Sequence, residues 1–396
     1  MSMYIPSYFE FVNSAKLLAG DYALENITEE MSLLGSSRPF LLSDKGLEKV
    51  GSVKTLLDIF SKSGLKVSGV FTDIPLDSSI LKVNEIASLY RKANADGIIA
   101  LGGGSVIDTA KGLRMLISQG GKDILKYAGA EVLPRGMNVP FTVIPTTSGT
   151  GSEATGVAVI KDEEKEVKLE FISSYLLPDV AVLDTRMLES MPPRITAITG
   201  LDALTHAIEA YSSMQRNPVS QAYAIAAMRL IIEYLPIAIK EPHNKKARLA
   251  MANAAYIAGA SFSNSMVGIV HAIGHSVGAV SGVPHGEAMS ILLVPSMKYN
   301  VNEAREEYSD ILLYIAGDVY ASTPKENRAE KAIEVLSDFV DQIRTMAPVR
   351  KTLSEAGVKK EDFQKIANRA INDGALIVNP RAADRDDVLR ILSEAF

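Results

Sequence analysis

Gly97-Ile-Ile-Ala-Leu-Gly-Gly-Gly-Ser-Val-Ile-Asp108 is the most informative stretch of this chain for its architecture. Residues 97–101 are typical of a buried strand, the glycines that follow indicate a turn, and a helix is expected from Ser105. Glycines let a phosphate approach the backbone, and a helix N-terminus offers free N–H groups and positive potential. The stretch therefore fits a phosphate-binding turn. A tight turn in which Ser105 only caps the helix is the alternative, because the run is neither G-x-G-x-x-G nor a P-loop.

The same alternation of short apolar runs and helical patterns extends through the first half of the chain. Further strands are predicted at Pro39–Ser43, Lys66–Thr72, Phe141–Ile144 and Val180–Leu183, and helices at Leu47–Ser63 and Ser79–Asn94. Strands that alternate with amphipathic helices are typical of βαβ units and a mostly parallel sheet. The charged stretch Lys161–Lys168 is expected to form a solvated hairpin or loop.

The pattern changes after Met191-Pro-Pro193. From Ile195 onward the helical period dominates, as in residues 220–239 and 247–260. We therefore predict two domains. Residues 1–190 are expected to form an α/β domain with a mostly parallel sheet, and residues 191–396 an all-α domain.

Composition narrows the class of protein. The 396 residues are 47% hydrophobic and 22% charged, which is typical of a globular chain. No run of 18 apolar residues occurs, and the N-terminal residues lack the pattern of a signal peptide, so we expect no membrane span and a cytoplasmic location. A net charge of −6 without a basic stripe argues against a nucleic-acid partner. The absence of cysteine excludes disulfides, iron–sulfur clusters and thiolate metal sites.

Two further features lie at the ends of predicted strands. Pro145-Thr-Thr-Ser-Gly-Thr-Gly-Ser-Glu153 follows the strand at 141–144, and ligands of open α/β sheets bind outside the carboxyl ends of strands. Two such turns on consecutive strands favour one nucleotide site over a polar loop that happens to be rich in glycine. Asp44 ends another strand, where an acid often binds the ribose of NAD. Because it precedes the glycine turn instead of following it by about 20 residues, a helix N-cap is an equal alternative.

All five histidines lie between residues 206 and 285, and four of them, His206, His271, His275 and His285, form a pattern together with Asp202. Asp202 and His206 are four residues apart, as are His271 and His275, so each pair lies on one face of a helix. His285 follows in an expected turn. A carboxylate and several imidazoles suit a divalent first-row ion such as Zn²⁺ or Fe²⁺. The alternative is a set of buried histidines hydrogen-bonded in a helical core. Five candidates are one more than a tetrahedral site needs, which leaves one for acid–base work.

These runs, in this order, resemble the iron-containing (group III) alcohol dehydrogenases over nearly the whole chain. The resemblance is carried by Gly102–Lys111, Pro145–Glu153, Leu177–Asp179, Met191–Pro193, Gly200–Tyr211, Val270–His275, Pro284–Gly286 and Asn379–Arg381. The stretch Phe9–Leu24 follows the family less well, and no role is carried over there.

The resemblance implies that residues 1–190 are a Rossmann-like dinucleotide-binding domain and that residues 191–396 are the metal-binding catalytic domain. It also implies roles for individual residues. It implies the metal ligands Asp202, His206, His271 and His285, and it leaves His275 as a proton-relay group near the nicotinamide. The cofactor contacts that it implies are Asp44, Gly102, Gly103, Gly104, Ser105, Asp108, Thr146, Thr147, Ser148, Lys168, Thr185 and Leu188. Among these, Asp44 matches the acid that favours NAD over NADP, and Thr185 and Leu188 would line the adenine end. A homodimer is expected from the same resemblance.

The expected reaction is hydride transfer between NAD(H) and a primary alcohol or aldehyde, with a metal, most simply Fe²⁺ and otherwise Zn²⁺, polarising the substrate oxygen. Relatives on the same scaffold are rivals, such as a glycerol or other polyol dehydrogenase or a dehydroquinate-synthase-like lyase. The run from Thr199 to Tyr211 favours the alcohol dehydrogenase branch. A metal-dependent hydrolase leaves the two glycine turns unexplained, and a nucleotide-binding sensor without catalysis is a further alternative.

Overall fold

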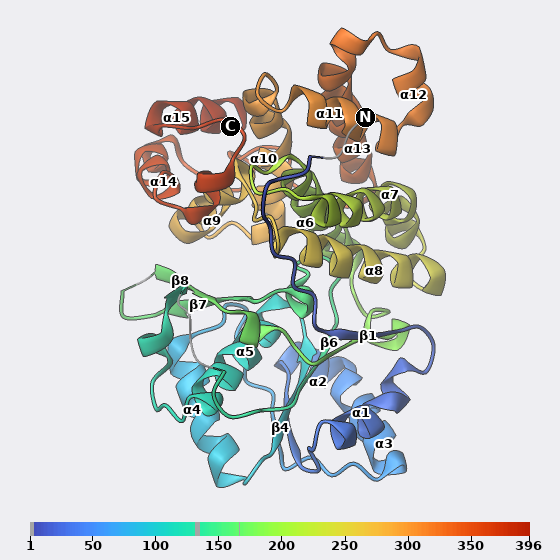
Figure 1. Ribbon diagram of the computed structural model, residues 1–396, viewed down its shortest axis with the longest axis vertical. Coiled ribbons are helices and arrows are strands. Elements are labelled where there is room, and N and C mark those ends of the chain that lie inside the picture. The colour runs from blue at the N-terminus through green and yellow to red at the C-terminus, as the bar shows by residue number, and fades with distance from the viewer. Residues whose placement is uncertain (1–3, 131–134, 166) are drawn as a thin grey trace. The chain divides into compact units, whose positions relative to one another are not determined.

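The computed structural model describes residues 4–130, 135–165 and 167–396, so Met1–Met3 of the N-terminal stretch and Glu166 of the charged stretch lie outside the described residues (Figure 1). The chain divides into two compact units. One comprises Val12–Met191, and the other comprises Pro192–Phe396 together with the N-terminal segment up to Phe11. The predicted change of pattern at Met191 coincides with this division. The N-terminal segment differs from the predicted boundary, because it belongs to the helical unit, where the Phe11 ring lies 5.4 Å from that of Tyr223.

The first unit is built on a six-stranded parallel sheet, as predicted. Its strands are β1 (Lys16–Ala19), β2 (Pro39–Leu42), β3 (Gly69–Phe71), β4 (Gly97–Gly102), β6 (Phe141–Pro145) and β9 (Val180–Leu183). Their order in the sheet is β1-β9-β6-β4-β2-β3. The chain leaves β2 toward one edge, to β3, and then crosses to β4 on the other side of β2. The direction of winding therefore reverses between β2 and β4.

Apolar cores lie on both faces of this sheet. Along β4, Ile98 and Ala100 join one core and Ile99 and Leu101 join the other, because successive side chains of a strand point to opposite faces. This burial on both faces explains why β4 is a continuous apolar run. The helices of the unit are α1 (Ile27–Leu33), α2 (Lys45–Val50), α3 (Ser52–Ser63), α4 (Ile80–Lys92) and α5 (Gly104–Ser118).

Several local elements differ from the sequence predictions. The helix predicted at 47–63 is interrupted, because Gly51 adopts a left-handed conformation with φ of 92° and separates α2 from α3. The strand β1 was not predicted. The charged stretch lies in a hairpin, as expected, formed by the antiparallel strands β7 (Val157–Asp162) and β8 (Val167–Ile172), and β5 (Gly129–Ala130) completes this second sheet.

The second unit is helical, and the structure contains no strand among the described residues beyond Met191. Its helices are α6 (Pro193–Ser212), α7 (Pro218–Lys240), α8 (Lys245–Phe262), α9 (Ile269–Ser281), α10 (His285–Asn300), α11 (Arg305–Ile315), α12 (Gly317–Ser322), α13 (Arg328–Met346), α14 (Phe363–Ala370) and α15 (Arg385–Glu394). Among the described residues, α7 alone is long and apolar enough, by length and composition, to cross a membrane. Its Met228, Ile231 and Leu235 are buried in the core of this unit, and a core helix passes the same test.

Candidate metal centre and nucleotide-binding edge

Four groups of predicted cofactor contacts follow four neighbouring strands. Asp44 follows β2, Gly102 ends β4 and Gly103–Ser105 follow it, Thr146–Ser148 follow β6, and Thr185 follows β9. Because these strands are parallel and adjacent, their carboxyl ends form one edge of the sheet. The winding reverses between β2 and β4, which is where open α/β sheets bind their ligands. The geometry thus brings together, on one edge, groups that the sequence could only place separately.

The glycine turn after β4 leaves the start of α5 uncapped. Gly103 is the N-cap residue, and no side chain among the described residues accepts a hydrogen bond there. Ser105 does not cap the helix, which corrects that part of the alternative; its hydroxyl donates to the carbonyl of Leu76 instead. A Cβ on Gly103 would lie 3.3 Å from the side chain of Thr147, which shows how closely the two turns approach each other. The helix start therefore offers free N–H groups to an anion.

Some of the other predicted cofactor residues lack hydrogen-bond partners for their side chains among the described residues, whereas Lys168 has a partner within the protein. Ser148 and Thr185 are buried, and their hydroxyl oxygens have no hydrogen-bond partner within the described part of the chain. Buried polar atoms normally have hydrogen-bond partners, so a bound ligand is a natural partner for these two hydroxyl groups. Leu188, three residues after Thr185, is fully buried. Lys168 instead pairs with Asp77 at 2.7 Å.

The carboxylates of Asp44 and Asp108 already form hydrogen bonds within the protein. Asp44 caps α2, since Oδ1 accepts a hydrogen bond of 3.0 Å from Leu47 N–H. Asp108 accepts hydrogen bonds from the Ser152 hydroxyl and from Val159 N–H, at 2.7 and 3.0 Å. The Asp108 carboxylate thus holds the segment after β6 in place. A contact between either residue and the cofactor stays a prediction.

Lys111 is a structural residue that the sequence reasoning missed, although it ends the first matching run. It is fully buried, and its ammonium donates to Ser152 Oγ, Thr155 Oγ1 and the Val157 carbonyl. Burial lowers its pKa to about 8. Lys111 thereby fixes the loop that carries Thr146–Ser148.

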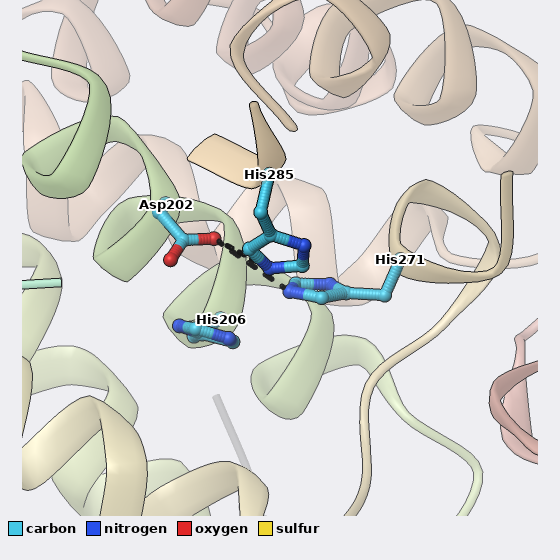
Figure 2. A group of neighbouring side chains, drawn as sticks. All are labelled: Asp202, His206, His271 and His285. Carbon is cyan, nitrogen blue, oxygen red and sulfur yellow. Dashed lines mark ion pairs between the residues drawn. The ribbon is translucent and has the colours of Figure 1, made fainter. Parts of the chain in front are cut away.

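In the helical unit, the four predicted metal ligands come together. Asp202 and His206 lie one turn apart on α6, His271 lies in the first turn of α9, and His285 is the first residue of α10 (Figure 2). One ligand atom from each of these four residues lies within 4.8 Å of the others. Asp202 Oδ1 lies 3.3 Å from His285 Nε2 and 3.8 Å from His271 Nε2. His206 stacks between Phe262 and His271, with ring centroids 4.3 and 4.5 Å away.

The chemistry of these atoms fits a divalent cation. Asp202 Oδ1, His206 Nδ1 and His271 Nε2 are buried, and none has a hydrogen-bond partner among the described residues. Burial alone would raise the pKa of Asp202, but the imidazoles of His206 and His285 outweigh it and hold that pKa below its ordinary range. Burial lowers the pKa of His206 to about 3 and that of His271 well below its usual value. A carboxylate and neutral imidazoles that face one another in a largely buried site are the form in which these residues bind metals.

Two carboxylates that the sequence reasoning did not select contact the histidines of α9. Glu209 Oε2 lies 2.6 Å from His271 Nδ1, and Asp373 Oδ2 lies 3.0 Å from His275 Nδ1. The signal for Glu209 was present, because it lies seven residues after Asp202 on the same face of α6. No pattern marked Asp373. His275 itself stands outside the four-residue group, with its ring stacked 5.4 Å from that of His285.

Comparison with known families and proteins agrees with this arrangement. The family described as iron-containing alcohol dehydrogenase matches residues 14–185, and the C-terminal part of the same family matches residues 196–396. The NAD-dependent methanol dehydrogenase of Bacillus methanolicus is 33% identical over 386 residues, which cover 98% of this chain and 99% of that protein. The 1,3-propanediol dehydrogenase of Klebsiella pneumoniae is 34% identical and covers 95% of this chain and 96% of its own.

Solved structures show the same similarity in three dimensions. The crystal structure of a 1,3-propanediol oxidoreductase has a TM-score of 0.93 and 33% identity, covering 98% of this chain and 100% of that one. The alcohol dehydrogenase from Oenococcus oeni has a TM-score of 0.92 at 32% identity with the same coverage. The chain therefore belongs to the iron-containing alcohol dehydrogenase family, as the sequence predicted, and is an oxidoreductase of that family.

Proposed function

We propose that this protein is a metal-dependent alcohol dehydrogenase, or aldehyde reductase, that transfers hydride between NAD(H) and a primary alcohol or aldehyde. The observation that carries the proposal is the set of three buried polar atoms, on Asp202, His206 and His271, with no hydrogen-bond partner among the described residues. Together with His285 they would hold one divalent ion, for which Fe²⁺ is our first choice and Zn²⁺ our second.

The two bound groups supply the chemistry that side chains lack. A divalent ion held here would supply a Lewis acid for the substrate oxygen, and NAD(H) would accept or supply the hydride. The residues of the chain hold these groups. The uncapped start of α5 suits the pyrophosphate, and Thr146, Thr147 and Ser148, which follow the neighbouring strand β6, suit the rest of the cofactor. We place Lys168, Thr185 and Leu188 at the same cofactor.

His275 is proposed as the group that carries the alcohol proton away. The pKa of Asp373 lies below its ordinary value, because its hydrogen bond to His275 outweighs the effect of burial. An ionised carboxylate only accepts, so Nδ1 of His275 carries the hydrogen, and Nε2 is the nitrogen that would act as the base. Its side chain is 31% exposed, which leaves it a route to solvent.

The His275→Ala variant is expected to retain the bound ion and to turn over roughly 10²-fold more slowly, which is the typical effect of losing a positioned proton-transfer group. The physical reason is that His275 lies outside the group of four ligand residues. Steady-state kinetics and metal analysis on one preparation make the measurement. If His275→Ala loses its ion as completely as His271→Ala does, the ligand set is wrong.

Oxidation of NADH by a panel of aldehydes and related ketones tests the proposed activity. We include 3-hydroxypropanal and glyceraldehyde or dihydroxyacetone beside simple aldehydes, because similar proteins act on propanediol and the polyol dehydrogenases were the nearest rivals. Turnover with simple aldehydes supports the proposal. Turnover with only 3-hydroxypropanal, glyceraldehyde or dihydroxyacetone favours a polyol dehydrogenase. If no compound of the panel oxidises NADH, the proposal is contradicted.

We further propose that the enzyme works as a cytoplasmic homodimer on small molecules. The support is the family resemblance and the acidic net charge of −6, which favours neither nucleic acid nor an anionic membrane surface. Light scattering of the purified full chain tests the dimer.

A further inference from the structure

We propose that Glu209 is a positioning residue of the metal centre, whose single carboxylate fixes both the start of α9 and the ring of His271. The inference rests on the metal centre proposed above. It concerns a residue that does not itself contact the ion.

The first part of the argument is the way α9 begins. Gly268 is the N-cap residue and contributes no side chain, so the first N–H groups of the helix need acceptors from elsewhere. Two other segments supply them. Val270 N–H donates to Glu209 Oε1 at 2.7 Å, and Ile269 N–H donates to Asn379 Oδ1 at 3.1 Å. The carboxylate of α6 therefore caps α9.

Gly268 is needed for this close approach. A Cβ at that position would lie 2.8 Å from Asn379 Oδ1 and 3.0 Å from Glu209 Oε1, which is too close for both atoms to stay in place. The backbone and the two acceptors are thus packed without room for a side chain. This packing fixes the carboxylate relative to the helix that carries His271.

The second oxygen of the same carboxylate contacts the ligand ring. Glu209 Oε2 lies 2.6 Å from His271 Nδ1, and both residues are buried. The other nitrogen, Nε2, faces Asp202 and has no hydrogen-bond partner within the described residues. A carboxylate behind an imidazole fixes the tautomer with hydrogen on Nδ1, leaves the Nε2 lone pair toward the ion and strengthens the ligand.

The helix α6 therefore carries more than its own two ligands. Asp202, His206 and Glu209 lie at positions i, i+4 and i+7, on one face of the helix. Two of them would bind the ion directly, and the third orients a ligand from α9. Both Glu209 oxygens are in use, so an amide in its place leaves either Val270 N–H or His271 Nδ1 without its acceptor.

The substitution Glu209→Gln tests the proposal on the full chain, freed of metal and titrated with Co²⁺ and Zn²⁺ against a competing chelator. Affinity for the ion should fall by about 10- to 100-fold, the usual effect of losing a partner behind a ligand histidine. The visible absorption spectrum of the Co²⁺ form should also change, since it reports the orientation of the ligands.

Asn379→Ala is the matched control, because it removes the other cap of α9 without contacting the His271 ring. It should lower the melting temperature and leave ion affinity and spectrum close to those of the wild type. If Glu209→Gln behaves as Asn379→Ala does, Glu209 is only a structural cap and the inference is overturned. Wild-type protein that binds no ion contradicts the metal centre instead, so the two failures are distinguishable.

Glu209→Asp carries the test if the glutamine variant does not fold. It keeps a carboxylate on a side chain one methylene shorter, which cannot reach Val270 N–H and His271 Nδ1 together. Weaker ion affinity in this variant supports the proposal, and wild-type affinity overturns it.

Discussion

Replacing His271 or Asp202 with alanine is expected to remove the bound ion and abolish turnover while NAD binding stays intact. A Lewis acid contributes several kcal/mol to such a step, and each ~1.4 kcal/mol is about tenfold in rate, so turnover should fall about a thousandfold or more. NAD binding should survive because the ligands lie in the helical unit and the glycine turns lie in the α/β unit. Metal analysis, steady-state kinetics and NADH fluorescence titration measure the three quantities.

His243→Ala is the control for this pair, since His243 is exposed and does not belong to the ligand group. It should keep wild-type metal content and rate. A ligand variant that loses its ion and still turns over at the wild-type rate contradicts the role of the metal.

The second large effect concerns the choice of cofactor. NAD(H) is expected to be preferred to NADP(H), with Asp44 as the cause. A carboxylate at this strand end can accept hydrogen bonds from the ribose hydroxyls of NAD, whereas the 2′-phosphate of NADP brings like charge against it. Such a contact costs on the order of several kcal/mol, enough to favour NAD by orders of magnitude. Asp44→Gly should therefore weaken NAD modestly and strengthen NADP markedly, measured as kcat/KM for both cofactors.

The capping role of Asp44 requires a second variant. Asp44→Asn keeps an acceptor for Leu47 N–H and removes only the charge, because asparagine is as good an N-cap as aspartate. Both variants should shift the cofactor ratio toward NADP, and only the glycine variant should also lose some thermal stability. An unchanged ratio in Asp44→Asn would mean that the residue is a helix cap alone.

The larger features of the fold were predictable because each leaves a local pattern. Strands buried on both faces, such as β4, are continuous apolar runs, and the helical unit shows one period throughout. β1 was missed because it is four residues long, begins with a lysine and pairs only with β9 at the edge of the sheet. The break between α2 and α3 depends on Gly51 in the left-handed conformation. A glycine within a helical pattern can either continue the helix or end it, so the sequence alone does not show the break.

In the candidate site, too, features within one helix could be predicted from the sequence and contacts between helices could not. The spacing of Asp202 and His206, and of His271 and His275, is a property of one helix and is visible in the sequence. The contacts of Glu209 with His271 and of Asp373 with His275 join residues 62 and 98 positions apart. They depend on how helices pack, which no spacing records. Ser105 illustrates the opposite error, since a serine beside a helix start suggests a cap, whereas the structure uses Gly103 there.

The most direct test of the account is a metal titration of chelator-treated protein, followed by NADH oxidation with an aldehyde that the enzyme accepts. Turnover should be absent without metal, return with Fe²⁺ or Zn²⁺ and saturate at about one ion per chain, as expected for a single site of one carboxylate and three imidazoles. NADH binding should be the same before and after the titration. Full turnover in the metal-free protein would contradict the account.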